Sequence, residues 1–146
     1  MRRGQLAQAS RTRAEAAKHL LNKSQQIAAY LGHVSLECAL KARILRQANV
    51  DTRSDLEKRL GPEYVNKLFS SKQGHALDFL SAQASLSRLL EVEHKPRLLE
   101  SAEWKRMIDP NRPYSLRYGT ESLSQEHARR EVEIADEIGE LIRRST

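Results

Sequence analysis

Basic and aromatic side chains alternate between residues 104 and 118. The interleaved residues are Trp104, Lys105, Arg106, Arg112, Tyr114, Arg117 and Tyr118. A guanidinium group can bind a phosphate while a neighbouring aromatic ring stacks on a base, so this pattern is typical of surfaces that bind nucleotides or RNA. The alternative interpretation is that the aromatic rings anchor the segment to the fold and the arginines only keep it soluble. The candidate binding residues from this segment are Arg106, Arg112, Arg117 and Tyr118.

Three polar residues, His33, Glu37 and Lys41, follow one another at four-residue steps and would share one face of a helix. Glu37 precedes Lys41, which is the favourable order for an ion pair on a helix. This arc is either a solvated edge or a polar seam that faces a partner or a ligand. His75 follows Gly74 at a predicted turn, and we add Glu37 and His75 to the candidate nucleotide- or RNA-binding residues as inner polar groups.

The motifs of several enzyme classes are missing from the sequence. It has no Gly-rich phosphate loop, no glycine-flanked serine of the acyl-transfer type, and no histidine three or four residues from another histidine, a cysteine or a paired carboxylate. We therefore expect no metal and no cofactor. A metal-independent ribonuclease is the exception, because it needs only a histidine for proton transfer and an arginine to stabilise the phosphorane.

The elements that must position these residues are predicted to be helical. Pro, Gly and aromatic residues are sparse, and the length of 146 residues fits one domain. Residues 26–46 show the longest helical pattern and carry two apolar stripes. The bulky stripe consists of Ile27, Leu31, Val34, Cys38 and Leu45, and the small stripe of Ala28, Gly32, Ser35, Ala39 and Ala42. We predict a buried central helix whose small stripe allows a neighbouring helix to approach closely.

Capping boxes and turn residues divide the rest of the chain. A box at Thr12 and Glu15 predicts that the first helix begins near residue 12. Residues 1–11 are then expected to be a flexible basic arm, followed by a single domain over residues 12–146. Further helices are predicted over residues 54–61, 62–69, 75–93, about 98–108 and 122–146, with a surface loop over residues 109–121. The fold class that follows is an all-α, up-and-down bundle of five or six helices.

The net charge of +6 is concentrated at the start of the chain. Residues 1–23 contain six basic side chains and one acidic side chain, whereas the remaining residues contain nineteen basic and eighteen acidic ones. This segment is either a solvated tail or a contact for phosphates or an acidic partner. No apolar run approaches the ~20 residues that cross a bilayer, and the start lacks the apolar part of a signal peptide, so we expect a cytoplasmic protein without membrane contact.

The order of these segments resembles a HEPN domain, an all-α module often encoded beside nucleotidyltransferases. The similar segments are AEAAKHLLNKSQQ, AAYLGHVSLECALKARIL, GHALDFL, and a tryptophan and RY before a final amphipathic helix. The resemblance covers nearly the whole chain. It implies a homodimer that acts as a nucleotide- or RNA-associated partner, as one half of a two-gene toxin–antitoxin or nucleotidyltransferase system.

The resemblance also implies an alternative, a ribonuclease toxin. Many HEPN ribonucleases pair an arginine at the dimer interface with a histidine that follows after four to six intervening residues. The pairs Arg13–His19 and Arg88–His94 match this spacing, but composition alone predicts about two such pairs. The family's motif tends to place a polar residue after the arginine, whereas Leu89 follows Arg88 here. We therefore keep Arg88 and His94 as the candidate catalytic pair and favour a protein that is not an enzyme; a plain dimerisation or assembly module is the third alternative.

Overall fold

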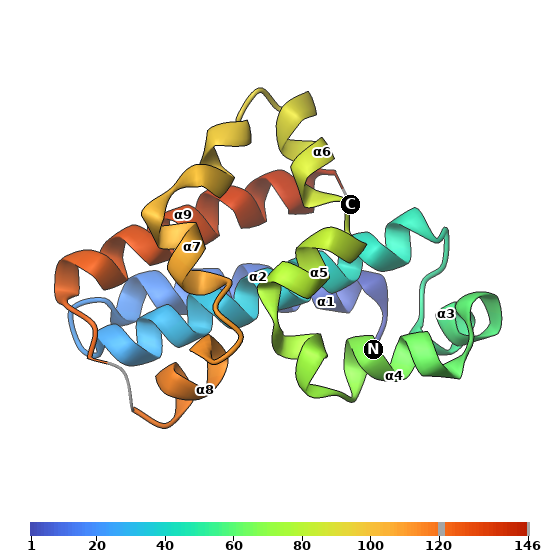
Figure 1. The fold of residues 1–146 in the computed structure, drawn as a ribbon, viewed down its shortest axis with the longest axis horizontal. Coiled ribbons are helices and arrows are strands. Elements are labelled where there is room, and N and C mark those ends of the chain that lie inside the picture. Colours follow the sequence, from blue (N-terminus) through green and yellow to red (C-terminus); the bar gives the residue numbers. More distant parts are fainter. Residues whose placement is uncertain (120–121, 146) are drawn as a thin grey trace.

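Three long helices form the centre of the molecule (Figure 1). The computed structural model describes residues 1–119 and 122–145. Helix α1 (Arg3–Leu20) and helix α2 (Gln25–Gln47) form a hairpin, and α9 (Gln125–Arg144) packs against both. The shorter helices are α3 (Arg53–Leu60), α4 (Pro62–Phe69), the 3-10 turn η1 (Lys72–His75), α5 (Leu77–Gln83), α6 (Leu86–Val92), the 3-10 turn η2 (Pro96–Glu100), α7 (Ala102–Met107) and α8 (Arg112–Arg117). The predicted all-α helical bundle is confirmed for the described residues, which contain no strand.

The central helix agrees with the prediction. Ser24 caps its first turn by accepting a hydrogen bond from the backbone N–H of Ile27 at 3.3 Å. All members of the small stripe are buried, and Gly32 lies against Val132 and Ala135 of α9. The bulky stripe is less uniformly buried: Leu45 is fully enclosed, whereas Ile27 at the other end is 51 % exposed. The small stripe is thus the face on which the long helices meet.

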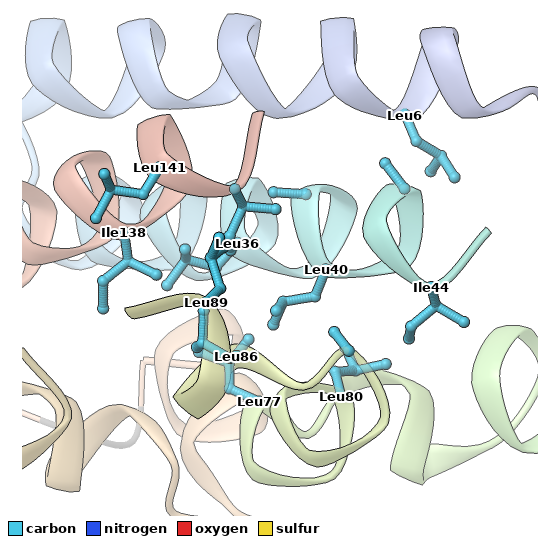
Figure 2. Packing of buried hydrophobic residues seen from close by; sticks show 14 of the residues in the cluster. Leu6, Leu36, Leu40, Ile44, Leu77, Leu80, Leu86, Leu89, Ile138 and Leu141 are labelled. Carbon is cyan, nitrogen blue, oxygen red and sulfur yellow. The ribbon is translucent and has the colours of Figure 1, made fainter. Parts of the chain in front are cut away.

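Leu45 of the bulky stripe is in the core, but several other large core side chains lie on a third face of α2, which the two stripes do not include. Leu36, Leu40 and Ile44 from this face meet side chains of α5, α6 and α9 (Figure 2). Leu77, Leu80, Leu86 and Leu89 come from α5 and α6, and Ile138 and Leu141 from α9. Burial of these leucines and isoleucines, at about 1.5–3 kcal/mol for each side chain, holds the short helices against the central one.

The first helix begins at Arg3, not near Thr12, so the expected flexible arm is helical over most of its length. Leu6 and Ser10 are buried on the same face as Ala14 and Ala17. The neighbours of Leu6 in the sequence are small or polar, so the apolar period of this face is difficult to recognise from the sequence. The backbone N–H of Arg3 also donates to the carbonyl of Asp51 at 2.8 Å, which ties the start of α1 to the end of the α2–α3 connection.

Hydrogen bonds also join the far end of the last helix to α1. The Oγ of Ser35 donates to the carbonyl of Ser10 at 2.7 Å, and Nη1 of Arg143 donates to Ser10 Oγ at 2.8 Å. Gly139 makes room for this guanidinium group, because a Cβ at residue 139 would lie 2.9 Å from Arg143 Nη1. These polar contacts between α1, α2 and α9 therefore add to the apolar packing of the long helices along the small stripe.

The predicted helix over residues 75–93 is divided into η1, α5 and α6. Ser85 has a left-handed backbone with φ of 52°, which interrupts the helix between α5 and α6. No glycine marks the break, since Ser85 itself adopts the conformation. Tertiary packing of the two short helices on α2 outweighs the continuous helical pattern in this part of the sequence.

The predicted loop over residues 109–121 contains helix α8. Pro113 lies in its first turn, where a missing N–H costs no helical hydrogen bond. Residues 120 and 121 of this predicted loop are outside the described part of the chain. The last helix begins at Gln125, three residues later than predicted, and is capped by Ser124, which accepts from the N–H of His127 at 3.1 Å. Within the described ranges, no helix combines the length and apolar character needed to span a bilayer.

Candidate functional site

The polar arc of α2 is buried where η1 packs on the helix. His33 is 1 % exposed, and its Nε2 lies 2.9 Å from the backbone carbonyl of His75. A carbonyl only accepts, so Nε2 carries the hydrogen and donates it. The Oε1 of Glu37 accepts from Nδ1 of His75 at 2.5 Å and lies 3.6 Å from Nζ of Lys41. Two side chains of α2 thus bind His75 of η1. His33 binds the backbone carbonyl of His75, and Glu37 binds the His75 ring.

Gly74 allows η1 to bring His75 to this place. The residue is buried, and a Cβ added to it would lie 2.3 Å from the carbonyl oxygen of Leu68. The backbone of η1 therefore packs directly on the end of α4, at a distance that no side chain permits. Nδ1 of His75 donates to Glu37, and the side chain of His75 is 55 % exposed.

Burial lowers the pKa of His33 below its ordinary value of 6.5, although the hydrogen bond to His75 and the charge of Glu37 act in the opposite direction. His33 is therefore neutral near pH 7, with its hydrogen on Nε2 and a lone pair on Nδ1. Within the described residues, this Nδ1 is buried and has no hydrogen-bond partner. An unsatisfied buried acceptor costs about 1–3 kcal/mol, so the arrangement reduces the stability of the fold.

A small cavity opens between α2, η1 and α8. Its volume is about 70 Å³, and its lining residues are Tyr30, His33, Glu37, His75, Pro113, Tyr114 and Arg117. One water molecule occupies about 30 Å³ in the liquid, so the cavity holds a few atoms and not a whole nucleobase. The buried residues His33 and Glu37 form its inner wall, and the exposed residues of α8 form its outer edge.

Two tyrosines and two cations lie at this outer edge, and we name Lys72, Tyr114, Arg117 and Tyr118 the rim. The rings of Tyr114 and Tyr118 stack with centroids 6.4 Å apart and planes at 18°. Lys72 Nζ lies 5.2 Å from the Tyr114 centroid, and Arg117 Cζ lies 5.6 Å from the Tyr118 centroid. Aromatic faces and positive charge therefore meet on one exposed surface, as the sequence pattern suggested for Arg117 and Tyr118.

Arg106 and Arg112 have a different environment from Arg117. Arg112 and Glu131 are 3 % and 2 % exposed, and Arg112 Nη2 lies 2.6 Å from Oε1 of Glu131. Arg106 Nε lies 3.5 Å from Oε2 of the same carboxylate. Trp104 is also buried. We name Arg106, Arg112 and Glu131 the buried network, which joins α7, α8 and α9 and holds the helix that carries the rim.

The candidate catalytic pair lies elsewhere. Arg88 is exposed on α6, and His94 follows that helix in a left-handed conformation with φ of 58°. His94 lines a separate hollow of about 420 Å³ between the α6–η2 connection, η2 and α9. Arg13 Nη1 donates to the carbonyl of Ala9, one turn earlier in its own helix. No hydrogen bond joins the arginine and histidine of either pair in the part of the chain that the structure describes.

Of the predicted binding residues, the structure brings Glu37, His75 and Arg117 together as walls of one cavity. The selection from sequence omitted His33 and Lys72. The position of His33, one helical turn before Glu37, is the sequence feature that could have identified it. Lys72 lies far from the basic and aromatic segment in sequence, and only the packing of η1 beside α8 brings it to Tyr114.

The described ranges contain no group of three or more His, Cys, Asp or Glu side chains placed to hold a metal ion. Comparison with known proteins gave no matching family model, no significant match among curated proteins and none among solved structures.

Proposed function

We propose that this protein is a HEPN-like helical module that binds nucleotides or RNA at the cavity and its rim. The observation that carries the proposal is the position of two stacked, exposed tyrosines with their two cations directly beside the buried His33–Glu37–His75 contacts. Stacking on an aromatic ring is worth about 1–3 kcal/mol for each base and tolerates every base. A guanidinium group adds bidentate binding of a phosphate.

Each part of the rim has a distinct role in this proposal. Tyr114 and Tyr118 form the stacking surface, and Arg117 and Lys72 bind the phosphate. His75 lies between the rim and the inner wall, where its half-exposed ring can contact a ligand. Arg106 and Arg112 act indirectly, because their ion pairs with Glu131 fix α8 on α9.

The resemblance to HEPN domains supplies the biological setting of the proposal. We propose a homodimer that works in the cytoplasm beside a nucleotidyltransferase or as half of a toxin–antitoxin system. The exposed Ile27 at the N-terminal end of the bulky stripe of α2 supports a further contact of this helix.

A binding titration with a labelled short RNA tests the proposal. Arg117→Gln should weaken binding about tenfold and reduce the slope of log affinity against log salt by about one. Arg59→Gln is the matched control, because this exposed arginine lies on α3 at the opposite end of the molecule (Figure 1). Equal affinities and salt slopes for the two variants and the wild type would contradict the proposal.

The alternative proposal is a metal-independent ribonuclease. Its supporting observation is that Arg88 and His94 are both exposed, so that a second copy of the chain can reach them. Expression of the wild type would then arrest growth, Arg88→Ala and His94→Ala would each relieve the arrest, and cleavage of RNA would persist in EDTA. A growth-neutral wild type without RNA cleavage would favour the binding protein.

A further inference from the structure

The inner wall of the cavity presents hydrogen-bond acceptors. The tautomer of His33 is fixed by its donation to the His75 carbonyl, which leaves Nδ1 as a buried acceptor without a partner in the described chain. Glu37 uses Oε1 for both His75 and Lys41, and no hydrogen bond from the described residues reaches its Oε2. The imidazole nitrogen lacks a hydrogen-bond donor and the carboxylate oxygen can accept one, and both atoms belong to residues that line the same small space.

A group that enters this space must donate hydrogen bonds and must not bring a lone pair of its own. An exocyclic amino group meets both conditions, because it carries two N–H donors and its nitrogen lone pair is delocalised into the base. A keto oxygen in the same place would face the lone pair of His33 and the negative charge of Glu37. Buried polar groups of this kind reject a ligand that leaves them unpaired far more strongly than an apolar wall would.

We propose that the cavity binds the exocyclic amino group of a nucleobase, so that adenine, guanine or cytosine nucleotides are preferred over nucleotides with a keto group in its place. This proposal rests on the proposed nucleotide binding and adds the chemical class of the base. His33 and Glu37 determine the specificity, and the rim supplies affinity that does not depend on the base.

The size of the cavity agrees with these separate roles of the cavity and the rim. A cavity of about 70 Å³ accommodates an amino group and the ring edge that carries it. The rest of the base would remain outside, against the exposed ring of Tyr114, with its phosphate near Arg117. The ligand would satisfy His33 Nδ1, which the protein alone leaves without a partner.

Calorimetric titration with matched mononucleotides tests the inference. Adenosine and inosine monophosphate differ by an amino group against a keto oxygen, as do cytidine and uridine monophosphate, and guanosine monophosphate adds an amino group to the inosine compound. At least one amino-bearing member should bind about tenfold or more tightly than its partner, which corresponds to about 1.4 kcal/mol. Affinities within twofold in every pair would overturn the inference while leaving the proposed function intact. Failure of all five to bind would overturn the inference, whereas RNA binding that still depends on Arg117 would preserve the proposed function.

Two variants assign the preference to named residues. His33→Leu removes the Nδ1 acceptor and offers no acceptor in its place, so the preference should fall to near one. Arg117→Gln should weaken both members of a pair equally and leave their ratio unchanged. Circular dichroism checks that each variant is folded. If His33→Leu is folded and retains the wild-type ratio, His33 does not determine the base preference and the inference fails; if it is unfolded, the ratios of the wild type decide.

Discussion

The buried network and the cavity contain similar chemical groups, a carboxylate beside cationic or imidazole side chains, but they differ in access to solvent. In the buried network, Glu131 binds Arg112 and Arg106, and both Arg112 and Glu131 are almost fully enclosed. At the cavity, Glu37 binds His75 and Lys41, while His75 remains half exposed. The network connects helices, whereas the cavity keeps acceptors available. An ionic cluster therefore indicates a binding site only where part of its hydrogen-bonding capacity faces an open space.

Helix α8 contributes to both regions. Arg112 at its start points into the buried network, and Arg117 at its end lies on the rim. One short helix is thus anchored by one arginine and exposes another. The two arginines should therefore respond to mutation in opposite ways, and this contrast organises the following predictions.

Removal of the shared carboxylate of the buried network should have the largest effect. Glu131→Ala leaves the enclosed Arg112 without its carboxylate partner, and we expect a loss of about 3–5 kcal/mol in the free energy of unfolding. Urea unfolding followed by circular dichroism measures it. Glu126→Ala is the matched control in the same helix, because its ion pairs with Arg129 and Arg130 lie on the surface. Equal losses for the two variants would show that burial of the network is not what makes it important.

Displacement of η1 should have the second largest effect. Gly74→Ala places a Cβ against the Leu68 carbonyl, and overpacking of this kind costs about 1–3 kcal/mol. The shift would also move His75 away from Glu37, so nucleotide binding should weaken together with stability. Gly4→Ala is the control, since nothing lies within 4 Å of its added Cβ. Normal nucleotide affinity in Gly74→Ala would mean that the position of His75 does not matter.

The third prediction concerns pH. The pKa of His33 is lowered in the folded protein and has its ordinary value of 6.5 in the unfolded chain, so the unfolded chain binds the proton more readily below pH 6.5. The stabilising contribution is complete above pH 6.5 and is lost as the pH falls toward the lowered pKa, at up to about 1.4 kcal/mol for each pH unit. Urea unfolding at a series of pH values should show this slope in the wild type. A His33→Gln variant with the same slope would assign the pH dependence to other groups.

The smallest effect on stability is expected at the rim. Arg117→Gln should change the free energy of unfolding by no more than about 0.5 kcal/mol, because the side chain is exposed. Its effect should appear in nucleotide binding instead. Arg112→Gln should instead lower the free energy of unfolding, because Arg112 is enclosed in the buried network. Unfolding curves of the two variants compare the two losses of stability directly. Similar losses of stability in both would remove the distinction between anchoring and binding arginines.

Local sequence signals predicted the features that depend on local structure. The helical period of α2 and its small stripe were both identified, because periodicity is a property of neighbouring residues. The burial of Arg112 could not be predicted, since it depends on Glu131 in another helix. The break at Ser85 and the helical start at Arg3 likewise follow from packing that the local pattern does not contain. Within the candidate site, Glu37, His75 and Arg117 could be selected by residue type, but their meeting at one cavity required the tertiary structure.

The bond from Arg143 to Ser10 has a consequence for the synthesis of the chain. The α1–α2 hairpin is made before α9, yet Gly32 on the small stripe of α2 is covered by Val132 and Ala135 of that later helix. An emerging chain therefore holds an incomplete interior until α9 leaves the ribosome. The last helix closes the bundle, and the nascent protein should depend on it to escape aggregation or proteolysis.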